Sequence, residues 1–248
     1  FKMDILNYNS LKKILKNTDC VFHHAALTSV PDSFTKAKSY HNVNVIGTEN
    51  ILKLSKEFGF KVIFASSAAV YGDQKKIPIK ENAKKNPLNP YGITKLKAEQ
   101  LCEKYAKKGV SVVVLRYFNV YGLRQNDNYA GVISKFLKNL SKEKPPIIYG
   151  SGLQIRDFVY VGDICKANYL TMTSKVKKGF VNIGSGKIKS IKQLANLMIK
   201  IHGMDSQPIF TNIQKGDIKL SQSDSTKAKK ILSWKSKTTL SSWLKNKI

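Results

Sequence analysis

The sequence predicts an α/β fold built around a parallel β-sheet. Short apolar runs rich in β-branched residues alternate along the chain with longer stretches that repeat apolar residues at helical spacing. Apolar residues make up 42% of the 248 residues, which is enough for a substantial core. Two glycine-containing turns, Tyr71-Gly72-Asp73 and Tyr121-Gly122, follow predicted strands. Ligands of open α/β sheets bind beyond the carboxyl ends of the strands, so these loops are candidate sites of chemistry.

Strands and helices alternate in the predicted order. We expect strands near 20–23, 62–65, 110–115, 147–149, 158–161, 180–183 and 209–213. We expect helices near 44–58, 91–107, 132–140, 163–173, 191–202, 226–232 and 240–247. Pro90 stands directly before the second helix, a position that helices tolerate. The chain contains no internal repeat and no low-complexity linker.

The charge is strongly basic. Lys and Arg total 43 residues against 16 Asp and Glu, a formal net charge of +27. Such a charge raises the hypothesis of a nucleic-acid partner. However, the arginines are only Arg116, Arg124 and Arg156, and the lysines are scattered through every helical segment. A dedicated nucleic-acid surface would use more arginine, so we interpret the lysines as a solvated surface and expect no nucleic-acid partner.

Cysteine spacing and hydropathy limit the class of protein further. Cys20, Cys102 and Cys165 are odd in number and form no CxxC pair or His/Cys cluster. We therefore expect neither a disulfide framework nor a metal site, and a reducing cytoplasm fits best. No apolar run approaches the roughly 20 residues that span a bilayer, so we expect no membrane partner.

Tyr91 and Lys95 carry the first chemical signal. They are four residues apart on a predicted helix and so share one face. Tyrosine has an ordinary pKa of about 10 and is a weak base at neutral pH. We expect the nearby ammonium to lower that pKa, so that the phenol can take a proton from a sugar hydroxyl as a hydride leaves the same carbon.

Ser66-Ser67 supplies the second signal. The pair ends the predicted strand 62–65, where an α/β fold presents reactive groups. A serine hydroxyl at this point can hydrogen-bond the reacting oxygen and share its proton with the tyrosine. A strand followed by Ser-Ser, Tyr-Gly-Asp and then Tyr-x-x-x-Lys is far more specific than any of these motifs alone.

These motifs resemble the extended short-chain dehydrogenase/reductase family, particularly its NAD-dependent UDP-sugar 4-epimerases. The resemblance covers essentially the whole chain and rests on residues 24–26, 66–72, 91–95, 115–122, 156–158 and 182–184. It implies a Rossmann-type doubly wound sheet with a smaller C-terminal α/β lobe. The NAD-binding domain would span 1–122 plus about 157–186, and the nucleotide-sugar lobe about 123–156 plus 187–248. It also implies a homodimer, paired through helices 44–58 and 91–107.

The resemblance assigns roles to individual residues. The catalytic residues would be Ser67, Tyr91 and Lys95. The NAD-binding residues would be Asp4, Ile5, Ala25, Ala26, Asn44, Ser66 and Phe118. The residues that contact the nucleotide sugar would be Asn119, Val132, Tyr149, Arg156, Asp217 and Ser221. Arg156 suits a bidentate grip on diphosphate, and Asp217 can accept from both ribose hydroxyls.

The reaction follows from the residues beside Ser67. Family members that dehydrate or decarboxylate the sugar carry acidic residues just after the strand serine or threonine, whereas this chain has Ala68 and Ala69. Alanine cannot move a proton, so the resemblance favours an isomerase that inverts C4 through a 4-keto intermediate. Ser221 falls where a small residue is similar to members that admit an N-acetyl group. UDP-hexose and UDP-N-acetylhexosamine both remain candidate substrates.

The chain departs from the family pattern in two respects. No GxxGxxG turn occurs, so we expect the first β-α-β unit of the family to be missing, with poor NAD binding as a consequence. Gln214 also stands where the family has arginine, and Lys215 can only partly replace that grip on diphosphate. Two alternative hypotheses therefore stay open: a non-catalytic nucleotide- or nucleic-acid-binding regulator on the same scaffold, and another nucleotide-sugar reductase.

Overall fold

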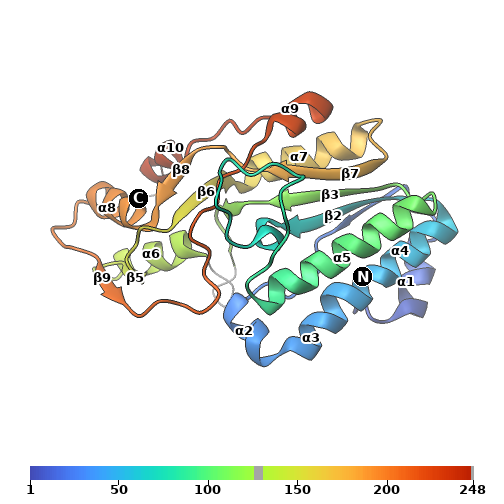
Figure 1. The fold of residues 1–248 in the computed structure, drawn as a ribbon, viewed down its shortest axis with the longest axis horizontal. Coiled ribbons are helices and arrows are strands. Elements are labelled where there is room, and N and C mark those ends of the chain that lie inside the picture. The colour runs from blue at the N-terminus through green and yellow to red at the C-terminus, as the bar shows by residue number, and fades with distance from the viewer. Residues whose placement is uncertain (126–130, 247–248) are drawn as a thin grey trace.

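The computed structural model describes residues 1–125 and 131–246. Its centre is a four-stranded parallel sheet in the order β1-β2-β3-β7. The strands are β1 (Cys20–His23), β2 (Lys61–Ser67), β3 (Val112–Tyr117) and β7 (Lys178–Ile183). Helices cover both faces of the sheet (Figure 1). The predicted α/β class is therefore confirmed.

Successive side chains of β2 and β3 point to opposite faces of the sheet and pack into two separate cores. Val62 and Phe64 point into a cluster with the buried faces of α4 (Gly47–Phe58) and α5 (Pro90–Lys107). Ile63 points the opposite way, into a cluster that includes α7 (Val161–Thr173). Each fully buried aliphatic or aromatic side chain contributes about 1.5–3 kcal/mol. A sheet buried on both faces needs the continuous apolar strands that this sequence supplies.

A second lobe packs beyond the carboxyl ends of these strands. Its strands are β4 (Asn119–Tyr121), β5 (Ile147–Tyr149), β6 (Ile155–Tyr160), β8 (Ile188–Ser190) and β9 (Ile209–Thr211). They form the sheet β4-β6-β8 and the pair β5-β9. The lobe's helices are α6 (Val132–Leu140), α8 (Ile191–His202) and α10 (Leu240–Lys245), which share one core (Figure 1).

Most predicted elements are present, with differences that have local causes. The strand predicted at 158–161 is β6, which begins three residues earlier, at Ile155. The prediction missed its first half because the charged Arg156 and Asp157 interrupt the apolar pattern. The short strands β4 and β8 were not predicted, and neither were α1 (Tyr8–Leu15), α2 (Val30–Thr35) and α3 (Ala37–His41). The helix predicted near 44–58 is α4 together with the end of a preceding π-helical turn, Asn42–Ile46. Residue 247 of the last predicted helix lies outside the described residues.

The C-terminal part of the chain returns to the central sheet. Ala228 and Leu232 on α9 (Thr226–Leu232), together with Trp234, are buried in the core that contains Ile63. The Trp234 indole donates to the Asp163 carbonyl over 2.8 Å. Residues 226–234 therefore share the core of the predicted NAD-binding domain, although we expected them in the sugar lobe.

Gly72 shapes the long loop that leads from β2 to α5. It adopts φ +63°, and a Cβ at this position would lie 1.8 Å from the Asn86 carbonyl oxygen. A collision with backbone cannot be relieved by a side-chain movement, so the turn requires glycine. The close approach brings residues 86–89 back beside the end of β2, where α5 begins.

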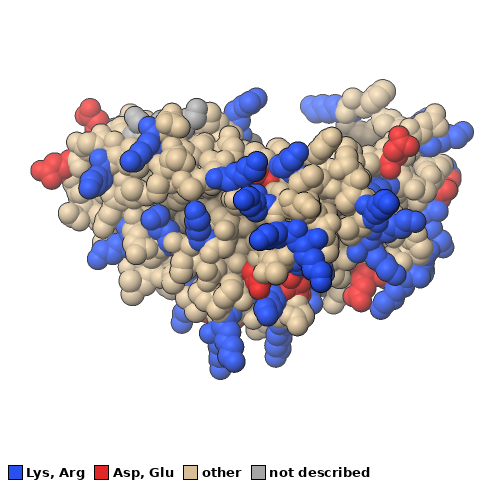
Figure 2. All heavy atoms as spheres, turned by 90° about the horizontal axis from the view of Figure 1, so that it is seen from above, with Lys and Arg blue, Asp and Glu red and all other residues tan. Residues whose placement is uncertain are grey.

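Basic side chains are widely dispersed on the surface. Figure 2 shows Lys and Arg spread over the whole visible face, with few acidic side chains between them. No stripe along a single element stands out in this view, in keeping with the scattered lysines of the sequence. Among the described helices, none combines the length and apolar character that a membrane crossing would need.

Candidate active site

A cavity of about 440 Å³ lies between the carboxyl ends of the central strands and the second lobe. Parallel strands end at one edge of the sheet, so the loops after β2 and β3 meet the lobe there. The cavity lining contains two of the three predicted catalytic residues and all of the predicted sugar-contacting residues. These lining residues are Ser67, Tyr91, Asn119, Val132, Tyr149, Arg156, Asp217 and Ser221.

Helix α5, which carries Tyr91 and Lys95, is held at its first turn. Asn89 caps α5 by accepting a hydrogen bond from the Gly92 amide over 2.8 Å. Gly92 itself packs so tightly that a Cβ would lie 2.8 Å from the Ala69 carbonyl oxygen. This contact fixes the start of α5 against the segment that follows Ser67. Tyr91 is thereby presented to the cavity from the first turn of the helix.

Lys95 lies one turn deeper and does not line the cavity. Its ammonium is buried, donates to the Ala65 carbonyl over 2.8 Å and lies 5.0 Å from the centre of the Phe64 ring. Burial lowers the Lys95 pKa to about 8, partly countered by the charge of Glu99. An ammonium has three donors, so further hydrogen bonds can be made beyond the one to Ala65.

The Tyr91 phenol differs from the sequence-based expectation. Burial raises the pKa of Tyr91, and its hydrogen bond with Ser67 only partly offsets that effect. The pKa of Tyr91 is therefore raised, whereas the spacing from Lys95 predicted a lowered one. The physical reason is that desolvation of a phenolate outweighs one hydrogen bond when the ring is packed against protein.

Ser66 and Ser67 face opposite ways, because successive side chains of a strand alternate. The Ser67 hydroxyl accepts from the Ala69 amide over 3.2 Å and lines the cavity. The Ser66 hydroxyl is buried and donates to Glu99 over 2.6 Å. We predicted Ser66 as an NAD contact, but its side chain belongs to the interior.

Arg156 forms an ion pair with Asp217 in the cavity wall. Burial lowers the pKa of the Arg156 guanidinium, and the Asp217 carboxylate counters that effect. Asp217 also accepts from the Gln154 side chain over 3.3 Å. A guanidinium and a carboxylate held side by side can bind diphosphate and ribose hydroxyls respectively.

Asp157 points to the opposite side of β6 from Arg156. Its two carboxylate oxygens are buried and accept from the amides and hydroxyls of Ser185 and Ser223 and from the Gly186 amide. The Ser223 segment also carries Ser221, which is buried in the cavity wall. Asp157 thus anchors the chain segment on which Ser221 and Asp217 lie.

The predicted NAD contacts lie at several places near the carboxyl end of the sheet. Asn44 makes two hydrogen bonds to the Leu27 backbone, over 2.8 and 3.0 Å, and so holds the loop that carries Ala25 and Ala26. Phe118 lines the cavity, beside the end of β3.

Two predicted NAD contacts, Asp4 and Ile5, lie at the start of the chain, before the first helix. Asp4 accepts from the Leu6 amide over 2.9 Å, and Ile5 packs against Gly47 at the start of α4. None of the predicted NAD contacts except Phe118 is among the residues that line the cavity.

Several cavity residues were not predicted. They include Asn89, Tyr117, Lys135 and Gly216. Tyr117 donates to Asn168 over 2.9 Å and stacks on His24, with ring centres 6.2 Å apart. The sequence offered a signal only for Asn89, whose position before Pro90 is typical of a helix cap.

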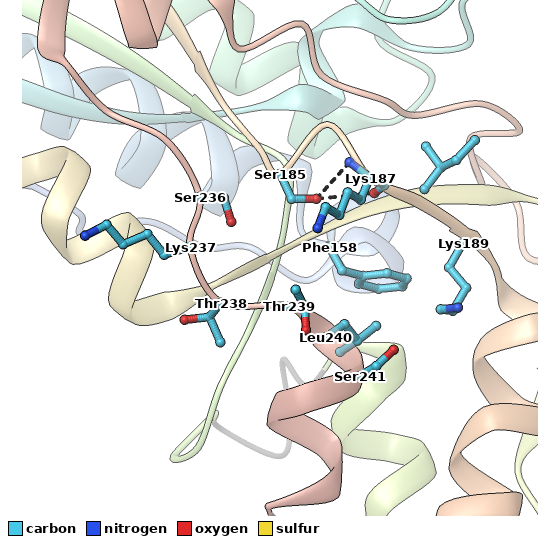
Figure 3. Close-up of a pocket in the computed structure, with 11 residues that line it drawn as sticks. Phe158, Ser185, Lys187, Lys189, Ser236, Lys237, Thr238, Thr239, Leu240 and Ser241 are labelled. Atoms are coloured by element: carbon cyan, nitrogen blue, oxygen red, sulfur yellow. Dashed lines mark hydrogen bonds between the residues drawn. The ribbon is translucent and has the colours of Figure 1, made fainter.

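A second cavity, of about 370 Å³, lies on the lobe between the β7–β8 loop and the start of α10 (Figure 3). It is lined by hydroxyl side chains and lysines and by no predicted site residue. The Ser185 hydroxyl donates to Asp157 over 2.7 Å, and the Ser236 hydroxyl donates to Asp163 over 2.9 Å. Since these donors are used within the protein, the cavity lined by Ser67 and Tyr91 is the better candidate site.

A doubly wound sheet with Ser67, Tyr91 and an Arg–Asp pair around one cavity defines a nucleotide-binding oxidoreductase or epimerase scaffold. A family model described as "NAD dependent epimerase/dehydratase family" matches residues 1–184. The chain therefore belongs to this NAD-dependent family. The resemblance drawn from the motifs is confirmed.

Known relatives agree with this assignment. The chain is 38% identical over 242 residues to the putative UDP-glucose 4-epimerase of Methanocaldococcus jannaschii, covering 93% of this chain and 78% of the relative. It is similar to the Thermotoga maritima UDP-glucose 4-epimerase solved with UDP-glucose, with a TM-score of 0.94, 35% identity and coverage of 99% and 81%.

A second similar structure belongs to an epimerase of N-acetylated UDP-sugars. It is the UDP-N-acetylglucosamine 4-epimerase of Methanobrevibacter ruminantium in complex with UDP-N-acetylmuramic acid. The TM-score is 0.93 and the identity 36%, with coverage of 99% of this chain and 80% of that chain.

Proposed function

We propose that the protein is an isomerase that inverts C4 of a UDP-hexose or a UDP-N-acetylhexosamine through a 4-keto intermediate. One observation supports it most: a single cavity joins the Ser67–Tyr91 pair to the Arg156–Asp217 pair. A nucleotide sugar bound by its diphosphate and ribose at one end would present its sugar to the hydroxyls at the other.

The residues around Tyr91 fit the nicotinamide side of NAD. When bound, NAD supplies the hydride acceptor and returns the hydride in the second half of the reaction. The Lys95 ammonium uses one of its three donors on the Ala65 carbonyl, so it could donate to the hydroxyls of the nicotinamide ribose of NAD. The Tyr91 phenolate takes the proton of the C4 hydroxyl and the phenol later gives it back, while Ser67 hydrogen-bonds the same oxygen. Because burial raises the Tyr91 pKa, this step requires the positive charges of Lys95 and of bound NAD+ to favour the phenolate. Phe118 supplies an apolar wall beside them.

The acid-base groups of the cavity favour epimerisation over elimination or decarboxylation. Ala68 and Ala69 line the cavity beside Ser67, and neither can move a proton. Asp217 is the one carboxylate among the described lining residues, and it pairs with Arg156. A site with one proton-transfer pair suits a reversible oxidation, after which the keto sugar turns and is reduced on its other face.

The choice between a UDP-hexose and a UDP-N-acetylhexosamine depends on the part of the cavity wall that contains Ser221. Ser221 is small and buried in that wall, which leaves room for an N-acetyl group beside C2 of the sugar. Lys215 lines the same cavity and adds a positive charge where Gln214 supplies none.

We also propose a cytoplasmic homodimer that pairs through α4 and α5. Ile93 on α5 and Ile46, which directly precedes α4, are partly exposed apolar residues and support such a contact.

The test is an assay of the purified protein with NAD and four substrates: UDP-glucose, UDP-galactose, UDP-GlcNAc and UDP-GalNAc. We expect interconversion within one or both pairs, measured by NMR, with no net consumption of NADH. Tyr91→Phe should lower kcat by at least about 100-fold, the usual contribution of a positioned acid-base group. Tyr169→Phe is the matched control, because Tyr169 is exposed on α7.

Three outcomes would contradict the proposal. Full activity of Tyr91→Phe would exclude the proton-transfer role. Consumption of one NADH for each sugar would indicate a reductase. Salt-sensitive binding of DNA or RNA, with no turnover of any UDP-sugar, would indicate a regulator instead.

A further inference from the structure

Asn89 makes two different hydrogen bonds with one side chain. Its amide oxygen accepts from the Gly92 amide over 2.8 Å, and its amide nitrogen donates to the Gly216 carbonyl over 3.3 Å. The side chain is almost fully buried, with 3% of the residue exposed. It therefore connects the first turn of α5 to a turn of the chain 127 residues later.

The residue type fits this double role and not capping alone. Asn, Asp and Ser are about equally favourable as helix caps, because each offers an oxygen to the free amides of the first turn. Of the three, only Asn also presents an amide donor in a fixed geometry. Capping therefore does not require Asn at this position, whereas the bond to Gly216 does.

Gly216 allows the two segments to approach closely. It adopts φ +77°, and a Cβ there would lie 3.2 Å from Asn89 Cβ and 3.2 Å from the Phe34 ring. Figure 1 shows the chain after β9 passing beside the start of α5. The Gly216 turn carries Lys215 on one side and Asp217 on the other, and both line the cavity.

Asn89 thus lies between the two ends of the proposed site. Tyr91 follows it by two residues on α5, and Asp217, the partner of Arg156, follows its acceptor Gly216 directly. A reaction that holds the nucleotide at one end and deprotonates the sugar at the other needs a fixed spacing between them. The Asn89 side chain bonds both to the helix that carries Tyr91 and to the turn that carries Asp217.

We propose that Asn89 is a positioning residue that sets the place of the Asp217 turn relative to Tyr91. The proposal rests on the proposed function of this cavity. It assigns Asn89 no contact with the reacting atoms, only the alignment of two groups that touch the substrate.

The test uses Asn89→Asp, which keeps the oxygen that caps α5 and loses the donor to Gly216. We expect a Tm below that of the wild type but a folded protein, because the helix N-terminus favours an acidic cap whereas the second carboxylate oxygen would face the Gly216 carbonyl in a buried site. We expect the Kd for UDP to rise about 10-fold, the scale of one lost hydrogen bond. KM for the UDP-sugar should rise with it, while kcat falls less.

Two further variants make the result decisive. Asn89→Ser also keeps a capping oxygen and should show the same loss of UDP affinity, so it replaces the Asp variant if that one folds poorly. Asn7→Asp is the matched control, because Asn7 caps α1 in the same way by accepting from the Ser10 amide over 3.1 Å. It should leave both UDP affinity and turnover unchanged.

The outcomes separate this proposal from the proposed function. Wild-type UDP affinity and wild-type kcat/KM in Asn89→Asp and Asn89→Ser would overturn the positioning role. A wild-type protein that binds UDP but converts no UDP-sugar would overturn the proposed reaction, and the UDP affinities would still decide the role of Asn89. A wild type that does not bind UDP would overturn both.

Discussion

At the scale of the residue, the candidate site is surrounded by ionisable groups whose protonation is controlled by burial. His23 ends β1, is buried and shares a hydrogen bond of 2.9 Å with Thr48. Burial lowers the His23 pKa to about 3, and the positive charge of Lys95 acts in the same direction. A neutral imidazole beside a buried ammonium avoids placing two positive charges in the interior.

The lowered pKa of His23 predicts a loss of stability in mild acid. The unfolded chain binds a proton at His23 below pH of about 6.5, whereas the folded protein does so only near pH 3. The stability contribution is therefore complete above pH 6.5 and is lost as the pH falls toward 3, by up to about 1.4 kcal/mol per pH unit. His23→Gln should flatten this dependence in urea unfolding between pH 6.5 and 4.5.

The matched control for that experiment is His202→Gln, because His202 is exposed at the end of α8. It should leave the wild-type pH dependence in place. Equal slopes for the wild type and His23→Gln would show that protonation of His23 does not couple to unfolding.

At the scale of the element, a buried ion pair holds α5 against the sheet. Glu99 on α5 accepts from the Arg116 guanidinium through both oxygens, over 2.9 and 2.7 Å. Arg116 also donates to the Tyr71 hydroxyl and the Glu81 carbonyl, each over 2.8 Å. Glu99 lies one turn after Lys95 on the same helix face, so the pair sets how α5 sits on β3.

Removing one partner of this pair should be costly. Arg116→Met leaves the Glu99 carboxylate buried without its cation and should lower the free energy of unfolding by about 3–5 kcal/mol. The double variant Glu99→Leu with Arg116→Met should lose less than the sum of the two single variants. Urea denaturation measures all of these values.

An exposed pair on the same helix provides the comparison. Lys107 and Glu103 lie 3.4 Å apart with most of both side chains in solvent. Lys107→Met should cost less than about 1 kcal/mol, as is usual for a surface pair. Additive losses in the Arg116 and Glu99 variants would contradict a coupled buried pair.

At the scale of the whole molecule, the charge of +27 acts against the compact state. Lysines are spread over the face seen in Figure 2, and the chain has far fewer carboxylates than basic groups, so folding brings like charges together. Salt screens such repulsion once the Debye length falls to about 10 Å, near 0.1 M.

We therefore expect the Tm to rise with ionic strength. An increase from about 20 to about 300 mM NaCl should add roughly 1 kcal/mol, or about 3 °C for a protein of this size. Differential scanning calorimetry measures the change. A variant with the exposed residues Lys142, Lys177 and Lys187 replaced by Glu should show a smaller rise, and a Tm that falls with salt would contradict the prediction.

The sequence by itself determined the α/β class, most of the helices and strands, and the motifs around Ser67, Tyr91 and Lys95. These features depend on side-chain periodicity and short spacings, which are properties of the local chain. The helices 132–140, 191–202 and 226–232 match their predicted bounds for that reason.

Only the tertiary structure decided which groups face one another. It turned Ser66 toward Glu99, paired Arg156 with Asp217, and brought Asn89 to Gly216 across 127 residues. It also placed residues 226–234 in the core of the sheet. Such contacts depend on the path of the whole chain and on which side of a strand each residue occupies, and no local pattern carries that information.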